Sequence, residues 1–548
     1  MTDPAARTQD ALATAAALRA DRPDWWRDAV YYTVYPRSFA DGNGDGIGDL
    51  PGLTSRLDHL VDLGVDAVWL GAFYRSPMVD GGYDVADHTD VDPEFGTLAD
   101  FDAMTAAAHE RGLKVTIDVI PNHVSDQHPW FVEALTAAPG SPARERFIFC
   151  DGRGPGGDEP PNNWVACFGG SAWARVPDGQ WYLHLFTPQQ PDLNWENPEV
   201  VAEYDRVLRF WLNRGVDGLR VDVAHGMAKP NPLRDMTIFP EPGQPRVAED
   251  PRLDQDGVHE HLRGFRRVLD TYPGTMAVGE VWVESDERLA RYVRPDELHL
   301  TFNFKLVEAE WGAAAYRAAI DGSLRAMADV GAPCSWVLTN HDIPRPVTRY
   351  GDGDIELGRR RARAAALVQL SLPGSVYLYQ GDELGLDNVD DLPVEALRDP
   401  TWENSGHTVR GRDGVRVPIP WSGDAPPYGF GGADTWLPMP TRWAGLTAEA
   451  QAADADSTLS LHRRALEIRR ASPQLGRGTL TWLDSPADVL AYRCAAEGHP
   501  DIEVWLNSSA DSIAPPSAAT PLLASGPLGA NGSIPPDTAA WFLGPDPR

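Results

Sequence analysis

Short runs of apolar and β-branched residues alternate with longer amphipathic segments along most of this chain. Such alternation is typical of parallel strands joined by crossover helices. The amphipathic segments 203–214 and 359–372, for example, carry apolar residues at helical spacing,. Eight strands are predicted, at 29–39, 67–73, 114–120, 218–224, 275–282, 297–304, 334–340 and 375–383. Eight strand and helix units in succession predict an α/β protein built on a closed (β/α)8 barrel, the TIM barrel.

Two stretches do not fit the barrel pattern. The gap between the third and fourth strands is much longer than a βα loop and is rich in Gly, Pro, Trp and Asn,. We therefore predict an inserted subdomain at 122–190. Alternating apolar runs near the carboxyl end predict a small antiparallel β domain at 476–548,. The barrel itself is then expected at 25–121 and 191–475, behind an N-terminal tail at 1–24.

The chain is long and strongly acidic. Its 548 residues exceed what one hydrophobic core usually organises, which agrees with a barrel that carries additional units,. It has 80 acidic and 48 basic residues and a formal net charge of −32. Such a surface repels phosphate backbones and anionic lipids, so nucleic acid and membranes are not expected partners. A neutral ligand is compatible with this charge, although solubility alone would also explain it.

Cysteine usage and the first residues of the chain indicate an intracellular protein. The four cysteines show no CxxC spacing and are too few for a disulfide framework in a chain this long,. The Ala-rich segment 1–23 has no basic region of the kind that begins a secretory signal,. No apolar run reaches the roughly 20 residues that span a bilayer. The cytoplasm is the predicted location.

Polar residues close several of the predicted strands, at the end where barrel enzymes carry their reactive groups. The fourth strand ends with Arg220 and Asp222, which the alternation of side chains places on the same side,. An arginine beside a carboxylate favours the ionised form that a nucleophile needs. Taken alone, however, this pair is better explained as a structural ion pair.

Two further strands end in carboxylates. The fifth ends with Glu280 beside Trp282, an aromatic wall that we expect to raise the carboxyl pKa and keep the group protonated, as a general acid requires,. The seventh ends with His341 and Asp342. Because like charges repel, three carboxylates at one barrel mouth indicate function rather than stability. Paired carboxyl groups suit glycoside cleavage, in which one protonates the leaving oxygen and the other attacks the anomeric carbon.

Four motifs carry a resemblance to a known family. They are Asp118-Val-Ile-Pro-Asn-His123, Gly218-Leu-Arg-Val-Asp222, Glu280-Val-Trp282 and Asn340-His-Asp342. In this order, on the third, fourth, fifth and seventh strands, they resemble the signature regions of the α-amylase superfamily, and the resemblance covers nearly the whole chain. It implies that Asp222 is the nucleophile, that Glu280 is the acid/base and that Asp342 holds sugar hydroxyls.

Other segments resemble one branch of this superfamily. The stretch 190–195, Gln-Pro-Asp-Leu-Asn-Trp, is similar to an extra motif of the oligo-1,6-glucosidase and α-glucosidase branch, which implies exo action. The segments 82–84 and 411–421 resemble the parts that close the pocket behind the terminal sugar, with Asp84 and Arg416 as a charge-assisted clamp,. The sugar-binding set that the resemblance implies is Tyr83, Asp84, His123, Arg220, His341 and Arg416. Val223 resembles the valine of α-1,6-specific members, whereas 224–226 resembles a branch of bacterial α-glucosidases, so the linkage stays open.

A loop after the first predicted strand carries oxygen ligands at alternating positions. Between 41 and 49, acidic and amide side chains alternate with glycine, as in the first half of an EF-hand loop,. The twelfth position is Gly52 and a strand precedes the loop, so it is not an EF-hand. The resemblance implies a structural Ca²⁺ or Mg²⁺ ion held by Asp41, Asn43, Asp45, the Ile47 carbonyl and Asp49. A metal-free turn of Asx and Gly residues is the alternative.

Together, the residues and the resemblance predict a retaining α-glucosidase. It is expected to release terminal glucose from short, neutral α-glucosides through a covalent glucosyl ester of Asp222, without an organic cofactor; the oligomeric state is left open. Three alternatives remain: an oligo-1,6-glucosidase, a glucosyl transferase or isomerase of the trehalose synthase type, and a catalytically silent sugar-binding scaffold. The presence of all three carboxylates argues against the scaffold.

Overall fold

Eight parallel strands form the centre of the protein. The computed structural model describes residues 22–244, 246–432, 434–515 and 520–544, and most of the predicted tail at 1–24 lies outside them. The strands are β1 (Val30–Val34), β2 (Ala67–Leu70), β5 (Lys114–Val119), β9 (Gly218–Val221), β10 (Met276–Gly279), β11 (Leu300–Thr301), β12 (Ser335–Val337) and β13 (Ser375–Tyr379). Each lies inside one of the eight predicted runs.

The strands pair in the order β11, β10, β9, β5, β2, β1, β13 and β12, and all these pairs are parallel. A bridge between Asn303 and Trp336 joins the two end strands, so the barrel is nearly closed and the predicted fold is confirmed. The strands are shorter than the predicted runs because the residues at their carboxyl ends leave the hydrogen-bonded ladder. These residues form the mouth of the barrel.

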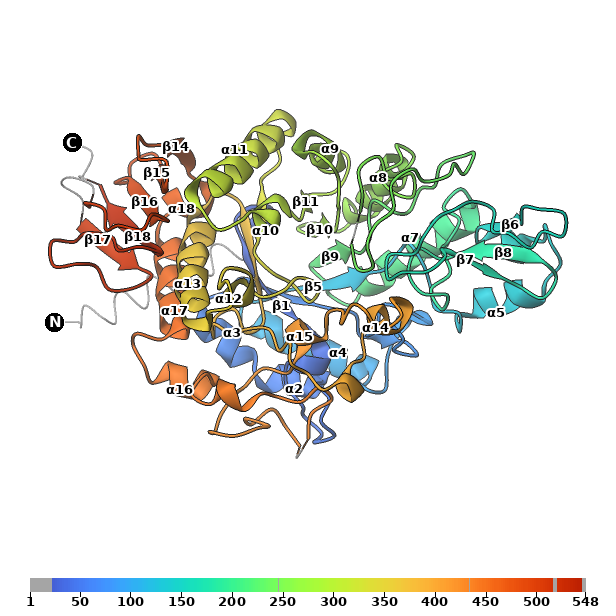
Figure 1. Ribbon diagram of the computed structural model, residues 1–548, viewed down its shortest axis with the longest axis horizontal. Coiled ribbons are helices and arrows are strands. Elements are labelled where there is room, and N and C mark those ends of the chain that lie inside the picture. The colour runs from blue at the N-terminus through green and yellow to red at the C-terminus, as the bar shows by residue number, and fades with distance from the viewer. Residues whose placement is uncertain (1–21, 245, 433, 516–519, 545–548) are drawn as a thin grey trace.

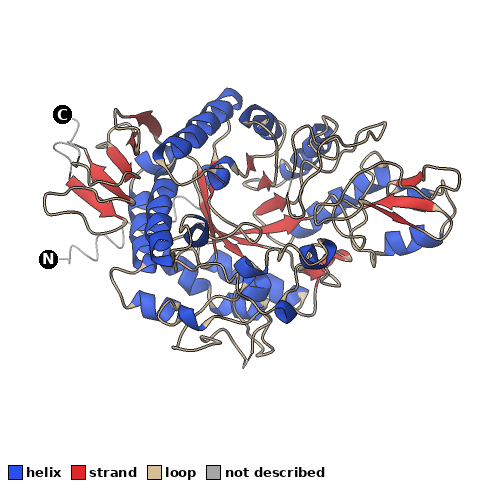
Figure 2. Ribbon diagram, in the orientation of Figure 1, coloured by secondary structure: helices blue, strands red, loops and turns tan. Residues whose placement is uncertain are grey.

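Helices surround the barrel (Figure 2). The longer ones are α4 (Leu98–Glu110), α7 (Pro198–Leu212), α8 (Val258–Leu269), α11 (Ala313–Val330), α13 (Ile355–Ser371) and α17 (Thr458–Ala471). The predicted helical segments 203–214 and 359–372 correspond to α7 and α13, which begin earlier than predicted. α7 begins at Pro198 because the Asn197 side chain accepts from the Glu199 N–H and proline suits the first turn,. Asp354 caps α13 in the same way.

Two smaller sheets lie at opposite ends of the molecule (Figure 1). Between β5 and β9, the antiparallel strands β6 (Phe149–Asp151), β8 (Gln180–Leu183) and β7 (Trp173–Arg175) form the inserted subdomain with α5 (Pro129–Thr136). The second sheet is antiparallel and contains β14 (Thr479–Trp482), β15 (Val489–Ala495), β16 (Ile502–Asn507), β18 (Thr538–Leu543) and β17 (Thr520–Ala524). It packs on α13, where Trp541 Nε1 donates to the Leu367 carbonyl at 3.1 Å. Both additions were predicted and are confirmed.

The structure also bears on the prediction that the protein does not associate with membranes. Within the described ranges, no helix combines the length and the hydropathy that a membrane span requires.

Candidate active site

The barrel brings Arg220 together with three carboxylates at the carboxyl ends of neighbouring strands. Arg220 lies in register with Asp118 on β5, while Asp222 and Glu280 directly follow β9 and β10. The buried guanidinium lies 2.5 Å from Asp222 Oδ1, 2.9 Å from Glu280 Oε2 and 3.4 Å from Asp118 Oδ2. Asp222 and Glu280 are therefore bound to one shared cation.

The shared arginine does not affect the two carboxyl groups equally. Burial raises the pKa of Asp222 well above its ordinary value, against the charge of Arg220. Burial would also raise the pKa of Glu280, but Arg220 and the Val223 N–H, 3.1 Å from Glu280 Oε2, bring it below its ordinary value. Trp282 Nε1 donates to Glu280 Oε1 at 3.2 Å, which favours the ionised form as well,. These contacts favour the ionised form of Glu280, contrary to the expectation that Trp282 keeps it protonated.

Asp342 lies beyond β12 among a different set of charges. Its Oδ1 accepts from Arg412 Nη1 and Arg416 Nη2, both at 2.9 Å, and its Oδ2 lies 3.3 Å from His341 Nε2. Although burial opposes it, these groups lower the pKa of Asp342, which is ionised at neutral pH. Burial lowers the pKa of His341 to about 3, so its ring is neutral. This ring stacks on Tyr83 at a centroid distance of 5.2 Å.

The expected clamp between Asp84 and Arg416 does not form. Asp84 is buried, and its carboxylate accepts from the Ser76 hydroxyl and from the N–H groups of Val79 and Asp80 at distances of 2.9, 3.0 and 3.0 Å. Among the described residues, no hydrogen bond or ion pair joins it to Arg416. The physical reason is that the turn at 76–84 uses this carboxylate to satisfy its own donors.

A different pair, Asp80 and Arg412, lies on the pocket wall. Arg412 Nη2 donates to Asp80 Oδ1 at 2.6 Å. Asp399 accepts from Arg412 Nε and lies 3.6 Å from Arg416 Nη1, so it holds the two arginines side by side. The sequence reasoning missed Asp80 and Arg412, each of which stands four residues before the residue predicted in its place. Their positions in the sequence could have identified them, because Asp80 directly precedes the Gly-Gly-Tyr turn and Arg412 directly follows Gly411.

His123 is oriented by a chain of polar groups behind the pocket. Lys229 Nζ donates to Asn122 Oδ1 at 2.9 Å, which turns the amide nitrogen of Asn122 toward His123 Nδ1 at 3.2 Å. Nδ1 therefore accepts, and the ring proton lies on Nε2, which donates to the Tyr83 carbonyl at 3.1 Å,. Asp192, 2.8 Å from Lys229, balances the lysine charge. Lys229 is thereby linked to the His123 ring through Asn122.

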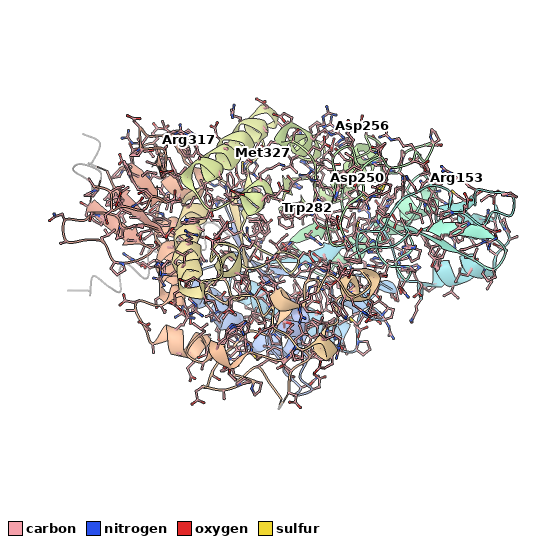
Figure 3. The ribbon with its side chains drawn as sticks, viewed as in Figure 1. Arg153, Asp250, Asp256, Trp282, Arg317 and Met327 are labelled. Carbon is pink, nitrogen blue, oxygen red and sulfur yellow. The ribbon has the colours of Figure 1, made fainter. Side chains whose placement is uncertain are left out.

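These groups surround a cavity of about 280 Å³, which is small for a ligand pocket,. The predicted residues on its wall are Tyr83, His123, Asp222, Glu280, His341 and Asp342. The other predicted residues, Asp84, Arg220 and Arg416, are not on the wall and support residues that are. Trp282 also lines the cavity, and Figure 3 shows it near the centre of the molecule.

The predicted metal loop folds on hydrogen bonds of its own. The Asp41 carboxylate accepts from four backbone N–H groups, and Asn43 and Asp45 each accept from the N–H two residues further on. Asp49 caps α2 (Leu50–Ser55) through the Gly52 N–H. Among the residues that the structure describes, no three Asp, Glu, His or Cys side chains are grouped to hold a metal ion. The ion that the resemblance implies at Asp41, Asn43, Asp45, Ile47 and Asp49 stays a prediction.

A parallel barrel with paired carboxyl groups at its carboxyl-terminal mouth defines an enzyme of the two-carboxylate, glycoside-cleaving class. Residues 33–478 match the family model described as "Alpha amylase, catalytic domain". The chain therefore belongs to the α-amylase family and is a glycoside hydrolase.

Similar proteins match most of the chain. A probable alpha-glucosidase of Rhizobium meliloti is 39% identical, over 87% of this chain and 88% of its own length. The oligo-1,6-glucosidase of Parageobacillus thermoglucosidasius is 35% identical, over 83% of this chain and 85% of its own. Among solved structures, the alpha-glucosyl transfer enzyme XgtA matches with a TM-score of 0.87 and 37% identity, over 95% of this chain and 99% of XgtA. A mutant of the trehalulose synthase MutB also has a TM-score of 0.87, at 32% identity over 95% of this chain and 100% of MutB.

Proposed function

We propose that this protein is a retaining, exo-acting α-glucosidase that removes terminal glucose from short, neutral α-glucosides. The observation that carries the proposal is the pair of carboxyl groups, Asp222 and Glu280, bound to Arg220 at the wall of a small pocket. Cleavage with retention uses one carboxyl group as acid and one as nucleophile, about 5 to 5.5 Å apart. Relatives named alpha-glucosidase and oligo-1,6-glucosidase support α-linked glucose as the substrate.

In the proposed reaction, Asp222 attacks the anomeric carbon while Glu280 protonates the glycosidic oxygen. Glu280 then removes a proton from the water that hydrolyses the glucosyl ester. The cycle needs one proton on the pair, and this proton has to be on Glu280 when the glucoside reacts. The Arg220 guanidinium lies 2.5 Å from Asp222 and favours the ionised nucleophile, and loss of its 2.9 Å contact with Glu280 on substrate binding would favour the protonated acid,.

The pocket around the pair supports exo action. The Asp80–Arg412 ion pair is part of its wall, and a chain passing through that wall would have to break it. Segments from different parts of the chain also meet closely next to the wall residue Phe168: a β-carbon on Gly169 would come within 2.8 Å of the Asn404 carbonyl oxygen. We therefore propose that one terminal sugar is enclosed and that its aglycone points outward.

Product analysis with the wild-type protein tests the proposal. We expect release of α-glucose, detected by proton NMR before the anomers equilibrate, from at least one of maltose, isomaltose, sucrose, trehalose and p-nitrophenyl α-glucoside. The ranking of these substrates gives the linkage preference, and faster cleavage of isomaltose than of maltose would favour the oligo-1,6-glucosidase alternative. Release of β-glucose would contradict retention, and internal cleavage of longer maltooligosaccharides would contradict exo action.

Glucosyl transfer is a second candidate, favoured by the structural likeness to XgtA and to the trehalulose synthase. In transfer, a sugar hydroxyl attacks the glucosyl ester in place of water. With concentrated maltose, transfer predicts trisaccharides or an isomeric disaccharide, whereas hydrolysis gives glucose as the sole product. A silent scaffold would bind the sugars without converting them.

Separate measurements test the metal ion, the cellular location and the oligomeric state. Elemental analysis of dialysed protein tests for a structural Ca²⁺ or Mg²⁺ ion, and loss of one equivalent in the Asp45→Asn variant would support the predicted loop. Cell fractionation tests the cytoplasm as the location, and light scattering gives the oligomeric state.

A further inference from the structure

The pocket wall has an apolar part in addition to the charged part already described. Its apolar side chains are Cys167, Phe168, Phe186, Pro242, Leu253 and Val409. Two of these rings mark the border with the charged part. Phe168 lies 4.7 Å from the Arg412 guanidinium, and Phe186 lies 4.9 Å from the His123 ring. The apolar wall is formed by the inserted subdomain, by the chain that follows β9 and, at Val409, by the chain that follows β13.

The apolar part is held in place by its own packing. The Gly243 N–H donates to the Cys167 carbonyl at 2.7 Å, which ties the segment after β9 to the subdomain. Leu253 belongs to a buried cluster with Trp164 and Leu185 of the subdomain. The wall is therefore built into the fold, and a ligand does not have to order it.

Few polar groups accompany these apolar side chains. Apart from the charged network and the residues that contact it, the polar side chains on the described pocket wall are His225, Gln244 and Thr401. Gln244 Oε1 already accepts from the Glu241 N–H at 3.1 Å, and His225 Nδ1 lies 3.3 Å from the Glu280 carbonyl oxygen. A second sugar ring could stack on the phenylalanines, but it would bring more hydroxyl groups than His225, Gln244 and Thr401 can pair, and the remainder would lose water without gaining partners,.

We propose that the leaving-group side of this pocket takes an apolar aglycone, an alkyl or aryl group, in preference to a second sugar. This inference rests on the proposed α-glucosidase function and names its substrate class. The reaction is unchanged: the glycosidic oxygen leaves with a proton from Glu280 as an alcohol or phenol, and water completes the hydrolysis. Each methylene that enters the apolar part improves binding about fourfold.

A series of straight-chain alkyl α-glucosides tests the inference, because methyl, butyl, hexyl and octyl glucosides have leaving groups of nearly equal acidity. We expect kcat/KM to rise two- to fourfold per methylene until the alkyl chain extends beyond the apolar wall. The kcat/KM for octyl glucoside should exceed that for maltose by at least tenfold. Equal kcat/KM values along the series, or a higher kcat/KM for maltose than for octyl glucoside, would overturn the inference and leave the α-glucosidase proposal intact.

If none of these glucosides and no disaccharide is cleaved, the proposed function fails and calorimetry decides the inference by itself. Affinity of the wild-type protein that rises from methyl to octyl glucoside supports the apolar wall. Equal affinities along the series refute it.

Two valine-to-threonine variants test whether the apolar wall causes the preference for long alkyl chains. Val409→Thr replaces a methyl group on the wall with a hydroxyl, and we expect it to lower the octyl-to-methyl ratio of kcat/KM about threefold. Val394→Thr makes the same change at an exposed site away from the pocket and should leave the ratio unchanged. Equal ratios in the two variants would contradict the assignment of the wall.

Discussion

The charged and the apolar part of the pocket wall differ in the forces that they can offer a ligand. In the charged part, carboxylates and arginines lie within hydrogen-bond distance of one another, and single guanidinium groups serve several acids. In the apolar part, aromatic and aliphatic side chains form the wall with few polar neighbours. Directional polar contacts fix one sugar in one orientation, whereas an apolar wall selects by size and hydrophobicity. Under the two proposals, the reaction and the choice of leaving group depend on separate residues, so substitutions in the two parts should have separable effects.

The largest effect is expected from Asp222→Asn. Loss of the nucleophile should lower kcat for p-nitrophenyl α-glucoside by about 10⁴-fold, for alkyl glucosides and disaccharides alike. The unfolding temperature should stay equal or rise, because burial raises the pKa of Asp222 and so opposes its ionisation in the folded protein,. Steady-state kinetics and thermal melts measure both. A variant that keeps a hundredth of the wild-type rate would contradict the role of Asp222.

Arg412→Lys should have the next largest effect. A lysine cannot bind Asp80, Asp342 and Asp399 together, so the grip on the terminal sugar should weaken and kcat/KM should fall about 10²-fold, mainly through KM,. The matched control is Arg410→Lys, two residues away and off the pocket wall. If both variants lose activity equally, the clamp is not at Arg412. The ratio between octyl and methyl glucosides should stay unchanged in both.

Lys229→Met tests the relay that orients His123. Burial lowers the pKa of His123, the carboxylates Asp192 and Asp80 and the Tyr83 carbonyl raise it, and Lys229 lowers it further. Removing the lysine charge therefore raises this pKa, so the acid limb of kcat/KM should move to higher pH with about a tenfold loss of activity. Lys229→Arg keeps the charge and should return the acid limb of the kcat/KM profile to its wild-type pH. An unchanged pH profile in the methionine variant would show that Lys229 has only a structural role.

The smallest effect is expected from Asp118→Asn. Burial raises the pKa of Asp118 to about 6, so the group is ionised above that pH and its charge helps to raise the pKa of Asp222. Removing this charge should lower the pKa of the Asp222–Glu280 pair, and the alkaline limb of kcat/KM should move to lower pH by up to about one unit. A shift to higher pH would contradict the account of the pair.

The barrel and its carboxylates could be predicted because they depend on local patterns. Each strand is an apolar run, and β9 and β10 end directly before Asp222 and Glu280. Parallel strands bring their carboxyl ends to one mouth, so residues far apart in the sequence could be placed together without knowing any distance.

The clamp could not be predicted because its two alternatives are close neighbours in the chain. Asp80 and Asp84 belong to one turn, and Arg412 and Arg416 lie one helical turn apart, Arg412 directly before α15 (Asp413–Arg416) and Arg416 at its end. Which acid faces the pocket depends on which one satisfies the N–H groups of the turn, and that is a property of the folded backbone. The ionised form of Glu280 was missed for a similar reason, because the sequence does not show that Arg220 and the Val223 N–H both lie against its carboxylate.

Trapping of the covalent intermediate tests the central claim most directly. The Glu280→Gln variant, which lacks the acid/base, would be mixed with α-glucosyl fluoride, whose fluoride leaves without a proton, and the digested protein would be analysed by mass spectrometry. One added glucosyl group is expected on the peptide that contains Asp222, and none in the variant that also carries Asp222→Asn. A glucosyl group on another residue, or release of β-glucose without any ester, would contradict the account.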